Sequence, residues 1–196
     1  IDVDLIENLK AKFPSISANI HHADFLKMDL KSGFGTSMGI IGNYPYNISS
    51  QILIKTIENR DIVPEMVGMF QKEVAERVTA KSGSKTYGRI SVMVNAFYHT
   101  EYLFKVGKGA FSPPPKVDSA VIRLTRKDHF KLNCNERLFS TVVAASFNQR
   151  RKTIKNALKP LIPKSQHIPD DLLNKRAEQL SVDDFIKMTN YLDQKL

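Results

Sequence analysis

The first two thirds of the chain contain short segments whose apolar residues recur with either a helical or a strand period. Near the start, Leu5, Ile6 and Leu9 have the spacing of one helix face, whereas SMGII (37–41) is a short run typical of a buried strand. The pattern predicts helices at 2–13, 49–59, 72–81 and 88–98. It predicts strands at 18–24, 37–41, 65–71, 101–111 and 119–127.

The order of these elements predicts an α/β fold. Strands that are separated by helices of this length need crossover connections, and such connections favour a parallel sheet. Only the proline-rich segment SPPPKVD (112–118) separates the last two strands. We therefore expect these two strands to form an antiparallel pair at the edge of the sheet.

After about residue 130 the pattern becomes helical throughout. Helices are predicted at 135–162, 170–180 and 182–194, separated by Pro163, Pro169 and Ser181. The sequence therefore predicts two domains, an α/β domain at 1–128 and a small all-helical domain at 129–196.

Composition limits the class of protein. The chain has 196 residues, 42% of them hydrophobic, and no apolar run of membrane-spanning length, which predicts a soluble globular protein without a membrane partner. Cys134 is the only cysteine, so an internal disulfide is excluded and a reducing, cytoplasmic location is favoured. His21 and His22 would point to opposite faces of a strand, so we expect no metal site.

Positive charge is concentrated in the second half of the chain. The net charge is +9, and residues 105–164 contain 14 Lys and Arg against 3 Asp and Glu. Such a block favours a polyanionic partner, although a merely solubilising surface is the alternative. In FNQRRKTIKNALKPL (147–161), an apolar stripe of Phe147, Ile154, Leu158 and Leu161 predicts one amphipathic helix. Its polar face would carry Arg151, Lys155 and Lys159.

The most informative short segment is NYPY (43–46), which directly follows a predicted strand. Ligands of open α/β sheets bind at the carboxyl ends of strands, and Asn43 lies at such an end. Pro45 restricts the preceding Tyr44, so the Tyr44 carbonyl and the Asn43 side-chain oxygen could be held as two adjacent acceptors. Tyr46 adds an aromatic face for a nucleobase. An ordinary strand-to-loop turn is the alternative.

Two acceptors at this spacing suit a primary amine such as the N6 amine of adenine. Its lone pair is delocalised into the ring, and hydrogen bonds from both N–H groups favour a more pyramidal and more nucleophilic nitrogen. The segment therefore predicts a site at which an amine is alkylated without a strong base.

The chain resembles the ribosomal RNA adenine dimethyltransferases, in particular the bacterial branch that modifies two adjacent adenosines near the 3′ end of small-subunit rRNA. NYPYNISS is similar to the N-L-P-Y-N-I-[ST] motif of that family. Further similar segments are 70–95, 111–124, 147–158 and 176–188. The resemblance implies a Rossmann-like methyltransferase sheet followed by a helical domain, S-adenosylmethionine as the cofactor, and small-subunit rRNA or a pre-30S particle as the partner of a monomeric enzyme.

The resemblance also implies roles for individual residues. Asn43 and the Tyr44 carbonyl would hold the target amine, Pro45 would fix their geometry, and Tyr46 and Phe111 would lie against the flipped base. Asp24 would accept a hydrogen bond from the cofactor adenine, with Phe25 beside that ring. Without the resemblance, Asp24 would be interpreted as a cap or turn residue and Phe111 as a core residue. RNA contacts are expected from Lys81, Lys85, Arg89, Lys116, Arg150, Arg151, Lys152 and Lys155.

Two features depart from the family pattern. Tyr44 stands where the family usually has leucine, a change that a role through the backbone carbonyl would tolerate. The glycine-rich loop and the ribose-binding acid of the family would precede Ile1, so we expect the chain to be amino-terminally truncated, without its first strands, and inactive by itself. 

The segment SGSKTYG (82–88) predicts a mobile loop at the substrate entrance, and Glu73, Glu76, Arg77 and Lys81 could form only a solvated helix face. Two other functions stay open at this point. They are a non-catalytic rRNA-binding assembly factor and a methyltransferase acting on large-subunit rRNA adenine.

Overall fold

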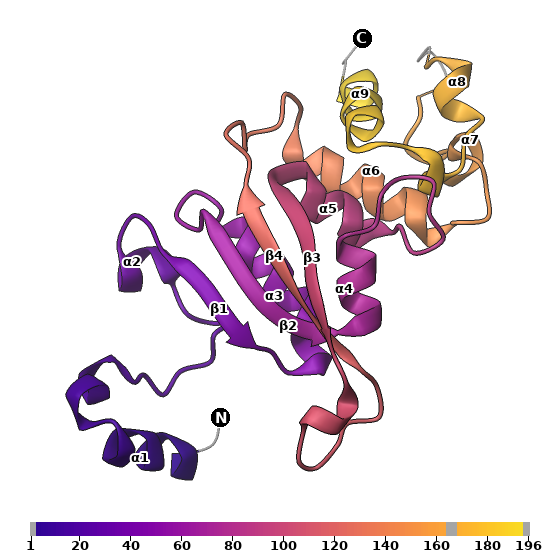
Figure 1. Cartoon of the computed structure of the whole chain (residues 1–196). Coiled ribbons are helices and arrows are strands. Elements are labelled where there is room, and N and C mark those ends of the chain that lie inside the picture. Colours follow the sequence, from indigo (N-terminus) through magenta and orange to yellow (C-terminus); the bar gives the residue numbers. More distant parts are fainter. Residues whose placement is uncertain (1–2, 164–167, 194–196) are drawn as a thin grey trace.

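A computed structural model of the chain describes residues 3–163 and 168–193, and its centre is a mixed four-stranded sheet (Figure 1). The strand order is β1-β2-β4-β3. β1 (Gly39–Asn43) and β2 (Glu65–Gln71) are parallel, and β4 (Ser119–Arg126) is antiparallel to both β2 and β3 (Tyr98–Val106). The predicted α/β class and the predicted antiparallel pair of final strands, with β3 at the edge, are confirmed. The bounds predicted for the first of these strands, 101–111, are wrong, because β3 begins at Tyr98 and residues 108–110 form a 3-10 helix.

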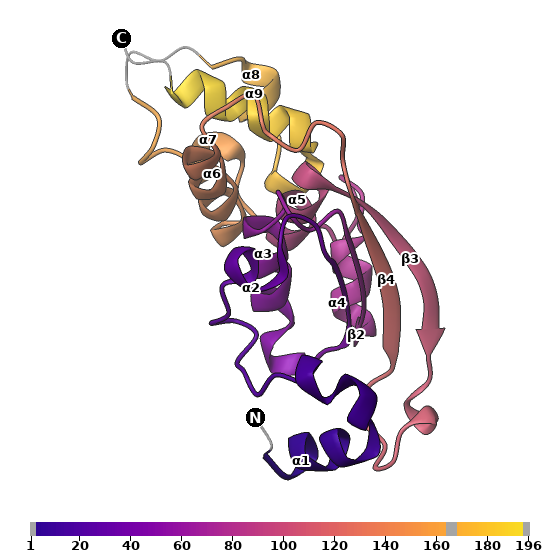
Figure 2. The same ribbon diagram turned by 90° about the vertical axis from the view of Figure 1, so that its left-hand side faces the viewer.

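Three helices cover one face of this sheet (Figure 2). α3 (Ser49–Glu58) connects β1 to β2, and α4 (Lys72–Val78) and α5 (Arg89–Phe97) connect β2 to β3. Side chains of alternate strand residues point toward these helices, so Ile40, Met66 and Phe70 are buried. On the opposite face, Ile41 is 85% exposed and Phe104 is 56% exposed.

The amino-terminal segment differs from the prediction at one strand. α1 (Val3–Lys12) forms as expected but has no buried residue, and Figure 1 shows it apart from the sheet. The predicted strand at 18–24 is wrong: η1 (Pro14–Asn19) is a 3-10 helix, and a turn begins at Asp24. A strand needs a neighbour for its backbone groups, and in the described part of the chain β1 pairs only with β2.

The carboxy-terminal part is helical, as predicted, but its first helix is shorter. α6 (Glu136–Asn148) is followed by a turn and by the short α7 (Ile154–Ala157), so the prediction of one helix through 135–162 is wrong. The chain leaves the helix because Thr153 forms a β-bridge with Arg176 and the Ile154 N–H donates to the Lys175 carbonyl at 2.8 Å. The predicted single helix at 170–180 is also wrong: α8 (Asp170–Leu173) and the 3-10 helix η4 (Ala177–Gln179) are separated by the β-bridge at Arg176. α9 (Val182–Asp193) follows as predicted.

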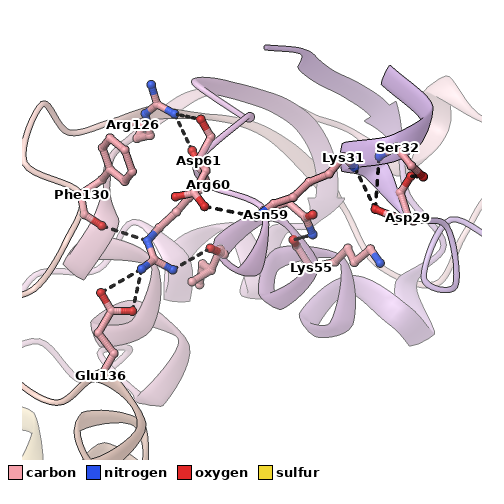
Figure 3. Close-up of polar contacts among 11 residues, drawn as sticks. Asp29, Lys31, Ser32, Lys55, Asn59, Arg60, Asp61, Arg126, Phe130 and Glu136 are labelled. Atoms are coloured by element: carbon pink, nitrogen blue, oxygen red, sulfur yellow. Dashed lines mark hydrogen bonds and ion pairs between the residues drawn. The ribbon is translucent and has the colours of Figure 1, made fainter. Parts of the chain in front are cut away.

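The helical part packs directly on the α/β part. Phe139, Val143 and Phe185 belong to the same buried apolar cluster as the sheet residues Met66 and Phe70. The segment between β4 and α6 is held by Arg60 and Arg126, whose contacts are drawn in Figure 3. The division into domains at residue 128 stays a prediction, because one continuous core spans it.

Candidate functional site

The candidate site lies where the parallel strands β1 and β2 end, at the edge of the sheet that is formed by strand ends and not by an outer strand. Since β1 and β2 run in the same direction, their last residues, Asn43 and Gln71, lie at one edge, together with Ser119 at the start of the antiparallel β4. Ligands of open α/β sheets bind at this edge. Asn43, the residue on which the sequence analysis rests, therefore has the expected position.

Two candidate hydrogen-bond acceptors belong to consecutive residues at the end of β1. The Asn43 side chain is exposed, and the Tyr44 N–H donates to the Met69 carbonyl at 3.3 Å, which prolongs the pairing with β2. Pro45 follows with φ −60° and ψ 134°. Within the described residues, neither the Asn43 amide nor the Tyr44 carbonyl is engaged in a hydrogen bond. Both oxygens are thus available to an incoming amine.

The Tyr46 ring is fixed by a contact that the sequence analysis missed. Its hydroxyl lies 2.8 Å from the hydroxyl of Ser119, which is fully buried at the start of β4. At the backbone, Tyr46 begins η2 (Tyr46–Ile48), and its carbonyl accepts a hydrogen bond from the Ser49 hydroxyl at 3.0 Å. A ring held at both ends keeps a constant orientation, which suits a stacking surface.

Phe111 follows η3 (Lys108–Ala110) in the loop between β3 and β4, and its side chain is half-buried. This loop is anchored by Asp118, which accepts hydrogen bonds from the Lys105 ammonium at 2.7 Å and the Lys108 N–H at 3.0 Å. The hydrogen bond from Lys105 and, to a smaller extent, that from the Lys108 N–H hold the pKa of Asp118 below its usual range.

Of the predicted RNA contacts, Lys116 lies nearest this edge of the sheet. It lines a cavity of about 450 Å³ together with Gln71, Lys108 and Asp118. Since Gln71 ends β2 beside the end of β1, this cation is placed next to the strand end that carries Asn43.

Asp24 and Phe25, the predicted cofactor residues, form the start of a turn. One Asp24 carboxylate oxygen accepts from the Leu26 N–H at 3.0 Å, and the other lies 3.9 Å from the Lys27 ammonium. The Asp24 side chain is 44% exposed, and Phe25 packs partly against the core. Asp24 is therefore a turn residue, and it still presents an accessible carboxylate beside an aromatic ring. That pair of groups fits an adenine amine and its ring.

The loop at 82–88, predicted to be mobile and to lie at the substrate entrance, packs against the helical part. Tyr87 is only 2% exposed, its ring lies 6.1 Å from that of Phe147, and burial, with a smaller effect of Asp184, raises its pKa to about 12. The Gly83 N–H donates to the Glu178 carbonyl at 2.6 Å. The loop follows α4 at the end that points away from Asn43, and a role at the substrate entrance stays a prediction.

This position brings predicted RNA-binding residues from two segments together. Arg150 donates to the Lys85 carbonyl, and Arg89 lines a shallow groove together with Asn148 at the end of α6. Arg150, Arg151 and Lys152 lie in the turn after α6, and all three are exposed. The prediction of a single helix face with Arg151, Lys155 and Lys159 is wrong, because α6 ends at Asn148.

The interpretation of α4 as a salt-bridged helix face is confirmed for its two glutamates, since both pair with basic residues of the same helix. Glu73 accepts from Arg77, and Glu76 lies 2.9 Å from Lys72. Lys81 lies beyond the end of α4 and is exposed. Together with Lys85, Arg89 and the residues of the 150–155 segment it forms what we call the basic surface, defined by Lys81, Lys85, Arg89, Arg150, Arg151, Lys152 and Lys155.

Two other kinds of feature, a membrane-spanning helix and a metal site, are absent from the described residues. None of the described helices is long and apolar enough to cross a membrane. In the same part of the chain, no three or more His, Cys, Asp or Glu side chains are grouped so that they could hold a metal ion, and His21 and His22 are exposed.

An α/β sheet with a prolyl turn at the end of a parallel strand, and an asparagine amide there that has no partner among the described residues, is what an amino-group methyltransferase requires. The comparisons agree with this class: the model of the family described as "Ribosomal RNA adenine dimethylase" matches residues 1–194. The chain belongs to this family.

Individual relatives resemble the chain over nearly its whole length. It is 52% identical to a ribosomal RNA small subunit methyltransferase A from Bacteroides thetaiotaomicron, with 100% of this chain and 74% of the relative covered. A solved dimethyladenosine transferase from Plasmodium falciparum is 26% identical with a TM-score of 0.79, covering 96% of this chain and 78% of that one. The 23S rRNA methyltransferase ErmE is 25% identical with a TM-score of 0.72, covering 99% and 80%.

Proposed function

We propose that the chain is part of an enzyme that transfers methyl groups from S-adenosylmethionine to the N6 amines of two adjacent adenosines near the 3′ end of small-subunit (16S) rRNA. The pair of free acceptors at the end of β1, the Asn43 amide oxygen and the Tyr44 carbonyl, is the observation that carries this proposal. The 52% identity to a small-subunit enzyme, against 25% to ErmE, favours small-subunit over large-subunit rRNA.

The residues of the site act on the amine by orientation. Each acceptor takes one N–H of the adenine amine, which directs the nitrogen lone pair away from the ring and toward the methyl donor. The Tyr46 ring, held through Ser119, and Phe111 would enclose the base after it has left the RNA stack. Once the new bond forms, the nitrogen is positively charged and releases a proton readily, so the site needs no strong base.

The cofactor would be held in part by the turn at Asp24. The Asp24 carboxylate oxygen that lies 3.9 Å from the Lys27 ammonium would accept from the adenine amine of S-adenosylmethionine, and Phe25 would lie beside its ring. When bound, the cofactor supplies a methyl group on a sulfonium sulfur, and the sulfur keeps the electron pair of the broken carbon–sulfur bond.

RNA binding would use two regions at opposite ends of the sheet. Lys116 lies at the Asn43 edge, and the basic surface lies at the other end of α4. The length of β2, seven residues or roughly 20 Å at strand spacing, sets the scale of the separation between Lys116 and the basic surface. Several nucleotides of RNA can cover such a length. We infer that a monomer acts on a pre-30S particle in the cytoplasm.

Methylation assays on two substrates test this proposal. The chain, extended to the length of its relatives, is incubated with labelled S-adenosylmethionine and either small-subunit particles or 23S rRNA. Dimethylation blocks the pairing edge of adenine, so stops of reverse transcription locate the modified positions. We expect two adjacent stops near the 3′ end of 16S rRNA. Binding without any stop would favour the assembly factor, and stops on 23S rRNA alone would favour the large-subunit enzyme.

A further inference from the structure

Tyr44 interacts with the sheet through its ring as well as through its backbone. Gly42 of β1 and Gly68 of β2 are directly paired in register, and the Tyr44 ring lies across both. A Cβ atom built on Gly42 would lie 2.6 Å from the ring edge, and one built on Gly68 would lie closer still to the opposite edge. Only glycine at both positions leaves room for the ring, because such separations are far below van der Waals contact.

The Phe70 ring forms a third wall of this slot. Phe70 is fully buried on β2, and its ring centre lies 5.1 Å from that of Tyr44 with an angle of 37° between the planes. We call the space enclosed by Gly42, Gly68 and Phe70 the ring slot. The Tyr44 hydroxyl is buried there without a hydrogen-bond partner among the described residues, and burial raises its pKa. The apolar ring therefore makes the contacts, rather than the hydroxyl.

Tyr44, whose ring fills the slot, also supplies one acceptor of the pair through its carbonyl. The Tyr44 residue is held by its ring in the slot, by its N–H on the Met69 carbonyl, and by the fixed φ of Pro45 that follows. With these three restraints, the peptide between Tyr44 and Pro45 has little freedom to rotate, so its carbonyl keeps one direction.

We propose that the Tyr44 side chain is a positioning residue: its ring, seated in the slot of Gly42, Gly68 and Phe70, aims the Tyr44 carbonyl at the target amine. This inference rests on the proposed function. It extends that function, because a role through the backbone alone would leave the identity of the side chain and of both glycines without effect. Small errors in the position of a reacting group lower turnover strongly while leaving remote binding contacts intact.

The test compares Gly68→Ala with Gly39→Ala in the chain extended to the length of its relatives. Gly39 lies on β1 as well, but its added Cβ would meet nothing closer than the Glu65 carbonyl oxygen at 4.0 Å. For Gly68→Ala we expect kcat to fall by at least about tenfold and the melting temperature to fall, with an unchanged Kd for rRNA. For Gly39→Ala we expect wild-type values of all three.

A second pair of variants covers the case in which Gly68→Ala does not fold. Tyr44→Leu empties part of the slot and should also lower kcat, and adding Gly68→Ala to Tyr44→Leu should refill the space and restore part of both kcat and melting temperature. A double variant better than the single Tyr44→Leu variant supports the slot, whereas additive losses overturn it.

The outcomes separate the two proposals. If Gly68→Ala matches Gly39→Ala, or if it lowers only the melting temperature and leaves the kcat of the folded enzyme unchanged, the positioning role is overturned and the proposed function stands. If the unaltered extended chain methylates no adenosine, both are overturned together.

Discussion

The Arg60 guanidinium and the Glu136 carboxylate form a two-point ion pair that joins the α/β part to the first residue of α6 (Figure 3). One guanidinium nitrogen lies 2.8 Å and 2.6 Å from the two carboxylate oxygens. Arg60 also donates to the Phe130 carbonyl at 2.9 Å, and its guanidinium lies 4.3 Å from the centre of the Phe97 ring. The side chains of Arg60 and Glu136 are 16% and 34% exposed, so water screens the pair only partly.

We expect Glu136→Ala to lower the free energy of unfolding by about 1–3 kcal/mol, because it leaves a half-buried guanidinium without its charged partner. Lys31→Ala is the matched control. It removes a pair with Asp61 in which the side chains are 55% and 52% exposed, and the loss should stay below about 1 kcal/mol. Urea denaturation of both variants measures the difference, and equal stabilities would contradict the importance of the Arg60–Glu136 pair.

Asn43→Ala should lower the turnover of the extended chain by roughly 10²-fold or more and leave its affinity for rRNA unchanged. The Asn43 oxygen would act on the reacting amine, whereas affinity would come from phosphate contacts elsewhere. Single-turnover methylation and filter binding measure the two quantities. Asn19→Ala, at an exposed position at the end of η1, is the control. An unchanged methylation rate for Asn43→Ala would remove Asn43 from the site.

Asp118 gives the loop between β3 and β4 a dependence on pH. Its folded-state pKa is lowered from the ordinary value of 3.8, first by the Lys105 hydrogen bond. The carboxylate therefore stabilises the fold above about pH 4, and this contribution is lost as the pH falls through the lowered pKa. Asp118→Asn should accelerate amide exchange of Lys108 at neutral pH, and the difference from the unaltered chain should vanish in acid. Asp128→Asn, at an exposed position, should have no such effect.

Segments whose local hydrophobic pattern and flanking residues are enough to specify a helix or a strand were predicted accurately from the sequence. β2 has the predicted bounds, 65–71, because polar residues flank a short apolar run, and α3 begins and ends within a residue of the prediction. Two of the wrong predictions depended on distant partners. The strand at 18–24 has no neighbour among the described residues, and the helix through 147–158 is broken by pairing with residues 175 and 176.

The residues of the candidate site divide in the same way, into those with a local signal in the sequence and those that depend on distant partners. Asn43 and Pro45 could be found because their chemistry depends on neighbouring positions in the chain. Ser119, which holds the Tyr46 hydroxyl, is 73 residues distant, and a buried serine carries no local signal. For Gly42 and Gly68, nothing in the sequence relates one glycine to the other. Only the strand register places them side by side under the Tyr44 ring.

The basic surface provides the last prediction, which separates RNA binding from mere solubility. Arg151 lies in the turn after α6 and Lys155 in α7, and both are exposed, so reversing them to Glu should leave the fold intact. If they contact phosphates, the double variant should bind rRNA more weakly, and the slope of log affinity against log salt should flatten by roughly one unit per lost contact. Reversing Lys10 and Lys12, which are exposed in α1, controls for net charge. Filter binding at several salt concentrations, with circular dichroism as a check of folding, measures both. Equal slopes for the two double variants would mean that charge alone, and not this surface, attracts the RNA.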